Sequence, residues 1–227
     1  NFYGLLTTLL FANAIISFIK NGGGNALSET VHTVLENYPK CSVDTLMNHL
    51  GTHDTARVLT MLGKSDGFIG DRTWQSQQKV SEHEYINGVK RLKAAAVIQY
   101  TLPGVPSLFY GDEAGVQGFG DPFCRATYPW GYENQELISF YKDLGKVRKE
   151  CKAFVDGDFY TVFADENSVA FTRSSKNSKA FIAVNRGNNA ACIALPDEFK
   201  VYKKIFGKQV NNGEIVLNEC EYCIIYK

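Results

Sequence analysis

The sequence carries no excess of charge of either sign. Lysine and arginine together number 24, aspartate and glutamate also number 24, and the formal net charge is zero. Proteins that hold nucleic acid through its phosphates concentrate Lys and Arg on one face. We therefore do not expect nucleic acid as a partner. The chain also has no internal repeat and no low-complexity tract.

Long apolar runs are absent as well. The longest apolar stretch near the start, residues 4–19, is interrupted by Thr7, Thr8, Asn13 and Ser17. A transmembrane helix needs about 20 mainly apolar residues, and no basic segment or cleavage site accompanies this stretch. We expect no membrane partner. Because the chain starts inside the stretch without a Met, we expect the natural N-terminus to lie elsewhere.

Cysteine is sparse, with six residues scattered over 227. Disulfide frameworks belong to short, cysteine-dense secreted chains, so this pattern favours free thiols and a reducing compartment such as the cytoplasm. Cys220 and Cys223 form a single CxxC, with no second pair and no His at zinc spacing. Buried free thiols are therefore favoured over a metal or redox site.

The first two thirds of the chain alternate between helical and strand patterns. Helices are predicted over 9–20, 28–38, 84–102 and 134–149, strands over 43–50 and 105–110, and loops over 64–81 and 111–131. Strand, loop and helix in alternation predict parallel α/β units. Such folds place their chemistry in the loops that follow the strands.

The pattern changes near residue 152. Seven short strand-like runs follow, with turn residues between them: 159–163, 169–173, 180–185, 190–195, 201–205, 215–217 and 222–226. Short strands at such regular spacing predict an antiparallel β-sandwich. The sequence thus predicts two domains, 1–152 and 153–227.

Residues 48–57, NHLGTHDTAR, place His53 and Asp54 where the first predicted strand ends. At that position a carboxylate can bind sugar hydroxyls or stabilise an oxocarbenium-like transition state, and a neutral imidazole can donate a hydrogen bond. Taken alone, the pair is better explained by a purely structural His–Asp hydrogen bond. His49, four residues before His53, leaves open a metal site of two His and one Asp, although no fourth ligand is evident.

Residues 101–130, TLPGVPSLFYGDEAGVQGFGDPFCRATYPW, form a second dense motif. Asp121 and Arg125 could clamp a polyhydroxylated ligand, with Tyr128 and Trp130 available for stacking, or could form a salt bridge that braces the loop. For the adjacent carboxylates at 112–113 a structural role is expected, because neighbouring side chains on an extended segment point to opposite sides.

Together, NHLGTHDTAR and LPGVPSLFYGDEAGVQGFGDPFCRATYPWG resemble the second half of an α-amylase superfamily enzyme, most of all its neopullulanase/cyclomaltodextrinase branch. The resemblance implies a (β/α)₈ barrel, of which residues 1–152 supply the last two β/α units, followed by the β-sandwich. It implies that Asp54 stabilises the transition state and that His53 donates a hydrogen bond to the sugar. Asp121 and Arg125 would contact a neighbouring glucose unit, and Arg57 would be a further substrate-binding residue.

Members of this family retain anomeric configuration with an Asp nucleophile and a Glu acid/base, and the nucleophile's G-x-R-x-D-type segment does not occur in these 227 residues. The resemblance therefore predicts part of a retaining hydrolase of maltodextrin, cyclodextrin or pullulan that is inactive by itself. The open barrel edge predicts stabilisation by the sandwich domain, by self-association or by a companion chain that supplies the rest. A transglycosylase of the same superfamily and a non-catalytic α-glucan-binding or assembly module remain alternatives. No cofactor or cation site is evident, and calcium is left open.

Overall fold

The computed structural model describes residues 2–64 and 70–227. Its helical part contains two three-residue strands and eight helices among the described residues. In chain order these elements are α1 (Phe2–Asn21), α2 (Gly24–Asn37), α3 (Lys40–Val43), β1 (Met47–His49), α4 (Val58–Gly63), α5 (Arg72–Gln77), α6 (Glu82–Thr101), β2 (Val105–Ser107), α7 (Gln135–Glu150) and α8 (Ala153–Asp156).

Strands β1 and β2 pair in parallel, with Met47 opposite Val105 and His49 opposite Ser107. The parallel pair agrees with the α/β pattern of the sequence, but both strands are shorter than predicted. Residues 40–43, which overlap the start of the first predicted strand, form the short helix α3 after Pro39. The predicted loop 64–81 contains α5, whose N-cap Asp71 accepts a hydrogen bond from the backbone of Trp74 over 2.9 Å.

Helix α6 begins with a capping box. The Ser81 hydroxyl accepts a hydrogen bond from the Glu84 backbone over 3.2 Å, and the Glu84 carboxylate accepts one from the Ser81 backbone over 2.8 Å. This reciprocal pair satisfies two backbone donors at the helix start. Most of the helix beyond residue 88 is buried, so α6 forms the centre of the helical layer.

The second part of the chain is antiparallel, as predicted. A five-stranded sheet has the order β3-β4-β5-β9-β7, and β6 pairs with β8 separately. The strands are β3 (Asp158–Ala164), β4 (Ser168–Ser174), β5 (Lys179–Asn185), β6 (Ala191–Ala194), β7 (Lys204–Gly207), β8 (Glu214–Leu217) and β9 (Tyr222–Tyr226), with a 3₁₀ turn at Asp197–Phe199.

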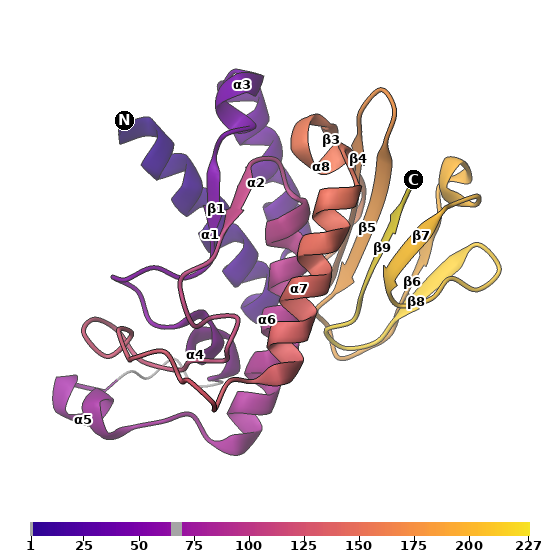
Figure 1. The fold of residues 1–227 in the computed structure, drawn as a ribbon. Coiled ribbons are helices and arrows are strands. Elements are labelled where there is room, and N and C mark those ends of the chain that lie inside the picture. Colours follow the sequence, from indigo (N-terminus) through magenta and orange to yellow (C-terminus); the bar gives the residue numbers. More distant parts are fainter. Residues whose placement is uncertain (1, 65–69) are drawn as a thin grey trace.

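The two faces of the five-stranded sheet pack against different layers, because successive side chains on a strand point to opposite faces. On β5, Ile182 and Val184 join a core shared with the helices, whereas Phe181 and Ala183 pack with residues of β6 and β8. Figure 1 shows the resulting order: helices, the five-stranded sheet, and then the β6-β8 pair.

The apolar core continues across residue 152, since one cluster includes Leu144 of α7, Phe154 of α8 and Phe171 of β4. The chain thus changes from helices to strands near the predicted boundary while its core is shared. The division into domains 1–152 and 153–227 stays a prediction.

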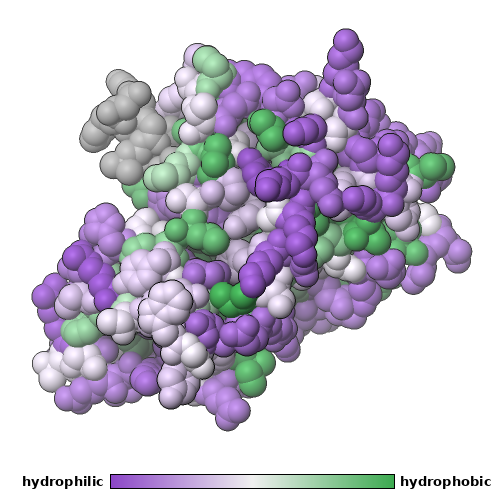
Figure 2. Space-filling view, in the orientation of Figure 1, coloured by the Kyte–Doolittle hydropathy of each residue, from purple (hydrophilic) through white to green (hydrophobic). Residues whose placement is uncertain are grey.

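The visible surface is mostly hydrophilic, with hydrophobic residues in separate small groups (Figure 2). Within the described residues, no helix combines the length and apolar character needed to cross a bilayer. All six cysteines lie in the described part of the chain and are free thiols.

Candidate functional site

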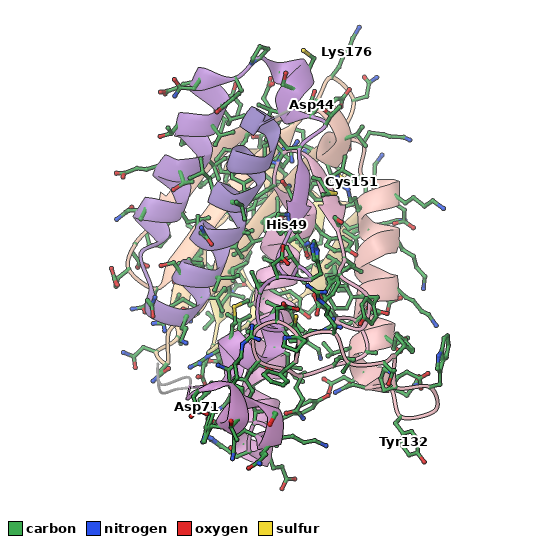
Figure 3. The ribbon with its side chains drawn as sticks, turned by 90° about the vertical axis from the view of Figure 1, so that its left-hand side faces the viewer. Asp44, His49, Asp71, Tyr132, Cys151 and Lys176 are labelled. Carbon is green, nitrogen blue, oxygen red and sulfur yellow. The ribbon has the colours of Figure 1, made fainter. Side chains whose placement is uncertain are left out.

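The site lies in the segments that follow the two parallel strands. Residues 50–57 follow β1 and residues 108–134 follow β2, so the parallel pairing brings both segments to the same edge. In Figure 3, His49 marks the end of β1, and Asp71 and Tyr132 lie on either side at the loop-bearing end of the molecule. This arrangement allows residues distant in sequence to meet.

Arg125 joins the two predicted carboxylates. Its Nη2 lies 2.8 Å from Oδ1 of Asp121 and 3.5 Å from Oδ1 of Asp54. The other oxygen of Asp54, Oδ2, lies 3.2 Å from Nε2 of His53. The structure therefore brings together four of the five predicted site residues.

These four side chains are open to solvent, with His53 and Asp54 67% and 71% exposed and Arg125 47% exposed. Ion pairs at such exposure add only about 0–1 kcal/mol to stability. Their effect is to orient the Asp54 carboxylate, whose two oxygens face different partners. One guanidinium between two carboxylates leaves the group with an excess of negative charge when His53 is neutral.

Backbone contacts tie the turn that carries the His–Asp pair to the second loop. The carbonyl oxygen of His53 accepts hydrogen bonds from Arg125 Nε over 3.0 Å and from Cys124 Sγ over 3.2 Å. Within the turn, the Asp54 backbone donates to Oγ1 of Thr52 over 3.2 Å. The sequence motif pointed to Arg125 but not to Cys124, although Cys124 lies between the two predicted residues of its loop.

Arg57, the fifth predicted site residue, lies in the interior. Its side chain is completely buried. Its Nε donates to the carbonyl oxygen of Cys124 over 2.6 Å, and its Nη1 donates to the carbonyl oxygen of Tyr110 and to Oδ1 of Asp112, the latter over 3.2 Å. A fully buried guanidinium cannot contact a ligand in this structure, so a direct substrate contact for Arg57 is not supported.

Asp112 has the structural role expected of it, but through an ion pair with Arg57. Burial raises the pKa of Asp112 to about 7, although the nearby guanidinium of Arg57 lowers it, and the adjacent Glu113 raises it further. Gly51 lies close by, because a Cβ there would stand 2.6 Å from Oδ2 of Asp112. Asp112 is thus packed tightly beneath the turn that carries His53.

His49 does not support the metal alternative. It is buried, and burial lowers the pKa of its imidazole, while the Met47 backbone raises that pKa by a smaller amount. His53 and Asp54, by contrast, are exposed. Over residues 2–64 and 70–227, no group of three or more His, Cys, Asp or Glu side chains could hold a metal ion.

The predicted stacking residues lie against each other, with Tyr128 half-buried and Trp130 exposed. The rings of Tyr128 and Trp130 have centroids 4.6 Å apart, and Trp130 is 79% exposed. Tyr132, which the sequence did not single out, is exposed beside them. Tyr110 anchors the same loop, since its hydroxyl donates to the carbonyl oxygen of Ala126 over 2.7 Å.

No family model matches the chain. An amylopullulanase of Thermoanaerobacter thermohydrosulfuricus is 35% identical over 202 residues, which cover 79% of this chain and 13% of that protein. A cyclomaltodextrinase of Geobacillus thermopakistaniensis is 34% identical over 167 residues, covering 72% of this chain and 24% of the relative. The chain therefore spans a quarter or less of the length of these relatives.

Solved structures agree in fold. A debranching enzyme from Nostoc punctiforme has a TM-score of 0.74 at 22% identity, covering 96% of this chain and 45% of that one. The type III pullulan hydrolase from Thermococcus kodakarensis has a TM-score of 0.76 at 23% identity, covering 96% and 35%. These relatives and neighbours are glycoside hydrolases of the α-amylase type. The chain belongs to the α-amylase superfamily and corresponds to a C-terminal portion of such enzymes.

Proposed function

We propose that this chain is the C-terminal part of a retaining glycoside hydrolase that acts on α-glucans such as maltodextrin, cyclodextrin or pullulan. The observation that carries the proposal is the contact of Arg125 with both Asp54 and Asp121. Through this contact the two sequence motifs of the family resemblance meet at one solvent-exposed site. The names of the relatives, amylopullulanase and cyclomaltodextrinase, indicate the substrate class.

In this proposal Asp54 stabilises the transition state. Retaining glycosidases pass through an oxocarbenium-like transition state, which a nearby carboxylate stabilises as positive charge develops on the sugar ring. Arg125 and His53 face different oxygens of Asp54, so they fix the plane of its carboxylate. His53 then donates a hydrogen bond to the sugar, and Asp121 with Arg125 contacts the neighbouring glucose unit.

The proposal assigns β1 and β2, with the helices that follow them, to the last two units of a (β/α)₈ barrel. The nucleophile and general acid of the reaction are not among the residues assigned here. We therefore expect the 227-residue chain alone to bind α-glucan weakly and not to hydrolyse it. The remaining barrel strands would come from another part of the same protein, from a companion chain or through self-association.

The test uses the complete gene product that carries these residues, with β-cyclodextrin, maltoheptaose and pullulan as substrates. We expect Asp54→Asn to lower kcat on the order of 10²–10³-fold, as for other groups that act electrostatically on a transition state. The matched control is Asp143→Asn on α7, where an exposed carboxylate pairs only with Lys146 in the described structure. An unchanged kcat in Asp54→Asn, or hydrolysis by residues 1–227 alone, would contradict the proposal.

A further inference from the structure

The geometry points to Arg57 as a positioning residue that holds the turn of His53 and Asp54 against the loop of Asp121 and Arg125 without touching the sugar. This inference rests on the proposed function, because that turn and that loop form the proposed site. It gives Arg57 a role in the reaction that differs from direct substrate binding.

Arg57 contacts the segment after β2, residues 108–134, at several points. Its backbone N–H donates to the carbonyl oxygen of Gly118 over 2.9 Å. Its Nε donates to the carbonyl oxygen of Cys124 over 2.6 Å, one residue before Arg125. Its Nη1 donates to residues 110 and 112, just beyond β2. One residue therefore connects the segment after β1 with the first part and the middle of the segment after β2.

The guanidinium has little freedom to leave this position. Its central carbon lies 4.2 Å from the ring centroid of Phe109 and 4.6 Å from that of Tyr110. Rings at such distances attract the cation, and more strongly where water is excluded. The charge is also paired with Asp112 in the interior. Arg57 therefore contacts the loops of the site from their buried side.

The contacts continue from Arg57 back to the catalytic turn. The carbonyl of Cys124 accepts from Arg57, the thiol of Cys124 donates to the carbonyl of His53, and Arg125 Nε donates to that same carbonyl. The chain of contacts returns to a residue four positions before Arg57. If Arg57 is removed, the Cys124 carbonyl loses its donor and the loop can shift relative to Asp54.

A lysine cannot replace this arrangement. The planar guanidinium places donors at fixed angles, whereas an ammonium is a single point on a flexible stem. Here Nε and Nη1 serve acceptors in different segments, and one nitrogen cannot occupy both positions. We therefore expect Arg57→Lys to lose the positioning effect even though the charge opposite Asp112 is kept.

The experiment compares the complete gene product with two variants. Removing Arg57 alone would leave the buried Asp112 carboxyl without its hydrogen-bond donor, which is destabilising, so the first variant is Arg57→Gln combined with Asp112→Asn. The second is Arg57→Lys. The matched control is Arg148→Gln, because Arg148 also donates from its guanidinium to two backbone carbonyls, those of Tyr100 and Gly104 over 2.5 and 2.6 Å.

The readouts are kcat and KM on maltoheptaose, measured well below the thermal midpoint of each variant, with folding checked by circular dichroism. We expect both Arg57 variants to lose about 10²-fold in kcat, the effect of moving a catalytic group by about 1 Å. Arg148→Gln should keep the wild-type kcat at an equal loss of stability.

Wild-type kcat in either folded Arg57 variant would overturn the inference, as would an equal loss in Arg148→Gln. Failure of the proposed function appears separately, since Asp54→Asn would then leave kcat unchanged. If Asp54→Asn abolishes turnover and the Arg57 variants do not, only the inference about Arg57 fails.

Discussion

Arg173 on β4 donates a hydrogen bond from Nη1 to the carbonyl oxygen of Thr101, the last residue of α6, over 2.7 Å. Its Nε and Nη2 both donate to the carbonyl oxygen of Gly157, over 3.2 and 2.8 Å. The side chain is fully buried, and burial lowers the pKa of Arg173 to about 10, with the nearby charge of Arg148 lowering it further. One guanidinium therefore joins the helical part of the chain to the sheet.

Replacing Arg173 by Met should destabilise the chain strongly. Met fills part of the volume but leaves the carbonyls of Thr101 and Gly157 without their donors in the interior, and each unsatisfied group costs about 1–3 kcal/mol. We expect the free energy of unfolding in urea to fall by about 2–4 kcal/mol. Lys176→Met, at an exposed turn of the same hairpin, is the control and should change little. Equal midpoints for the two variants would contradict this prediction.

Two glycines should respond to alanine in opposite directions. A Cβ on Gly24, at the start of α2, would stand 2.5 Å from the carbonyl oxygens of Asp165 and Ser168. Gly145, inside α7, has nothing within 4 Å of its Cβ position. Gly24→Ala must therefore push backbone apart, whereas Gly145→Ala only removes the cost of glycine in a helix.

We expect Gly24→Ala to lower the free energy of unfolding by about 1–3 kcal/mol and Gly145→Ala to raise it by about 0.5–1 kcal/mol. Thermal unfolding of both variants beside the wild type measures the difference. A stabilised Gly24→Ala variant would show that α2 can move away from the β3-β4 hairpin at little cost.

The buried Asp112 predicts a specific pH dependence of stability. Its pKa in the folded chain is about 7, against an ordinary value of 3.8, because burial outweighs the attraction of Arg57. Between these values the folded state keeps a proton that the unfolded state releases, so stability falls as pH rises from about 4 to about 7. The charges facing this carboxyl are Arg57 and Glu113, and the hydroxyl of Tyr141 also interacts with it.

The measurement is urea unfolding at about pH 5 and about pH 8 for the wild type and Asp112→Asn. We expect the wild type to lose more stability between these pH values than Asp112→Asn, which cannot titrate at this position. Asp143→Asn, an exposed carboxylate on α7, should leave the wild-type pH dependence unchanged. Parallel pH profiles for the wild type and Asp112→Asn would show that Arg57 keeps Asp112 ionised throughout.

Much of the fold follows from local sequence patterns. The elements that the sequence did not predict are short. Helices α6 and α7 lie within two residues of their predicted ranges, because periodicity over many residues is a strong signal. Helices α1 and α2 begin earlier than predicted, at residues 2 and 24 in place of 9 and 28. Short elements are different. The six residues of α4, 58–63, are too few to show a period, and strand β1 keeps only residues 47–49 of its predicted range 43–50. Tertiary contacts decide such short segments.

In the candidate site too, the contacts between residues close in sequence were predicted, and those between distant residues were not. Local spacing predicted the His53–Asp54 pair and the Asp121–Arg125 pair, whose members are close in sequence. The contact of Arg125 with Asp54 spans 71 positions and depends on the parallel pairing of β1 and β2. Spacing also cannot tell whether an arginine in a motif points outward or inward. The resemblance implies that Arg57 binds substrate, whereas its side chain is buried in this structure.

The guanidinium of Arg125 contacts a backbone carbonyl and two carboxylates at once. Its Nε holds the His53 carbonyl, and its Nη2 lies between the carboxylates of Asp54 and Asp121. Arg125→Lys keeps the positive charge but cannot make both sets of contacts. Because the side chain is about half exposed, the free energy of unfolding should change by less than about 1 kcal/mol. Binding and turnover should suffer far more.

We expect Arg125→Lys in the complete gene product to raise KM for maltoheptaose about tenfold, corresponding to about 1.4 kcal/mol of lost binding, and to lower kcat as well because Asp54 loses a partner. The control is Arg72→Lys. Arg72 belongs to α5, and its contact with the same loop is a long hydrogen bond of 3.4 Å to the Asp121 carbonyl. Its kinetics should match the wild type. Wild-type KM and kcat in Arg125→Lys would mean that charge alone suffices at this position, and the bridge between the two carboxylates would then have no part in substrate binding.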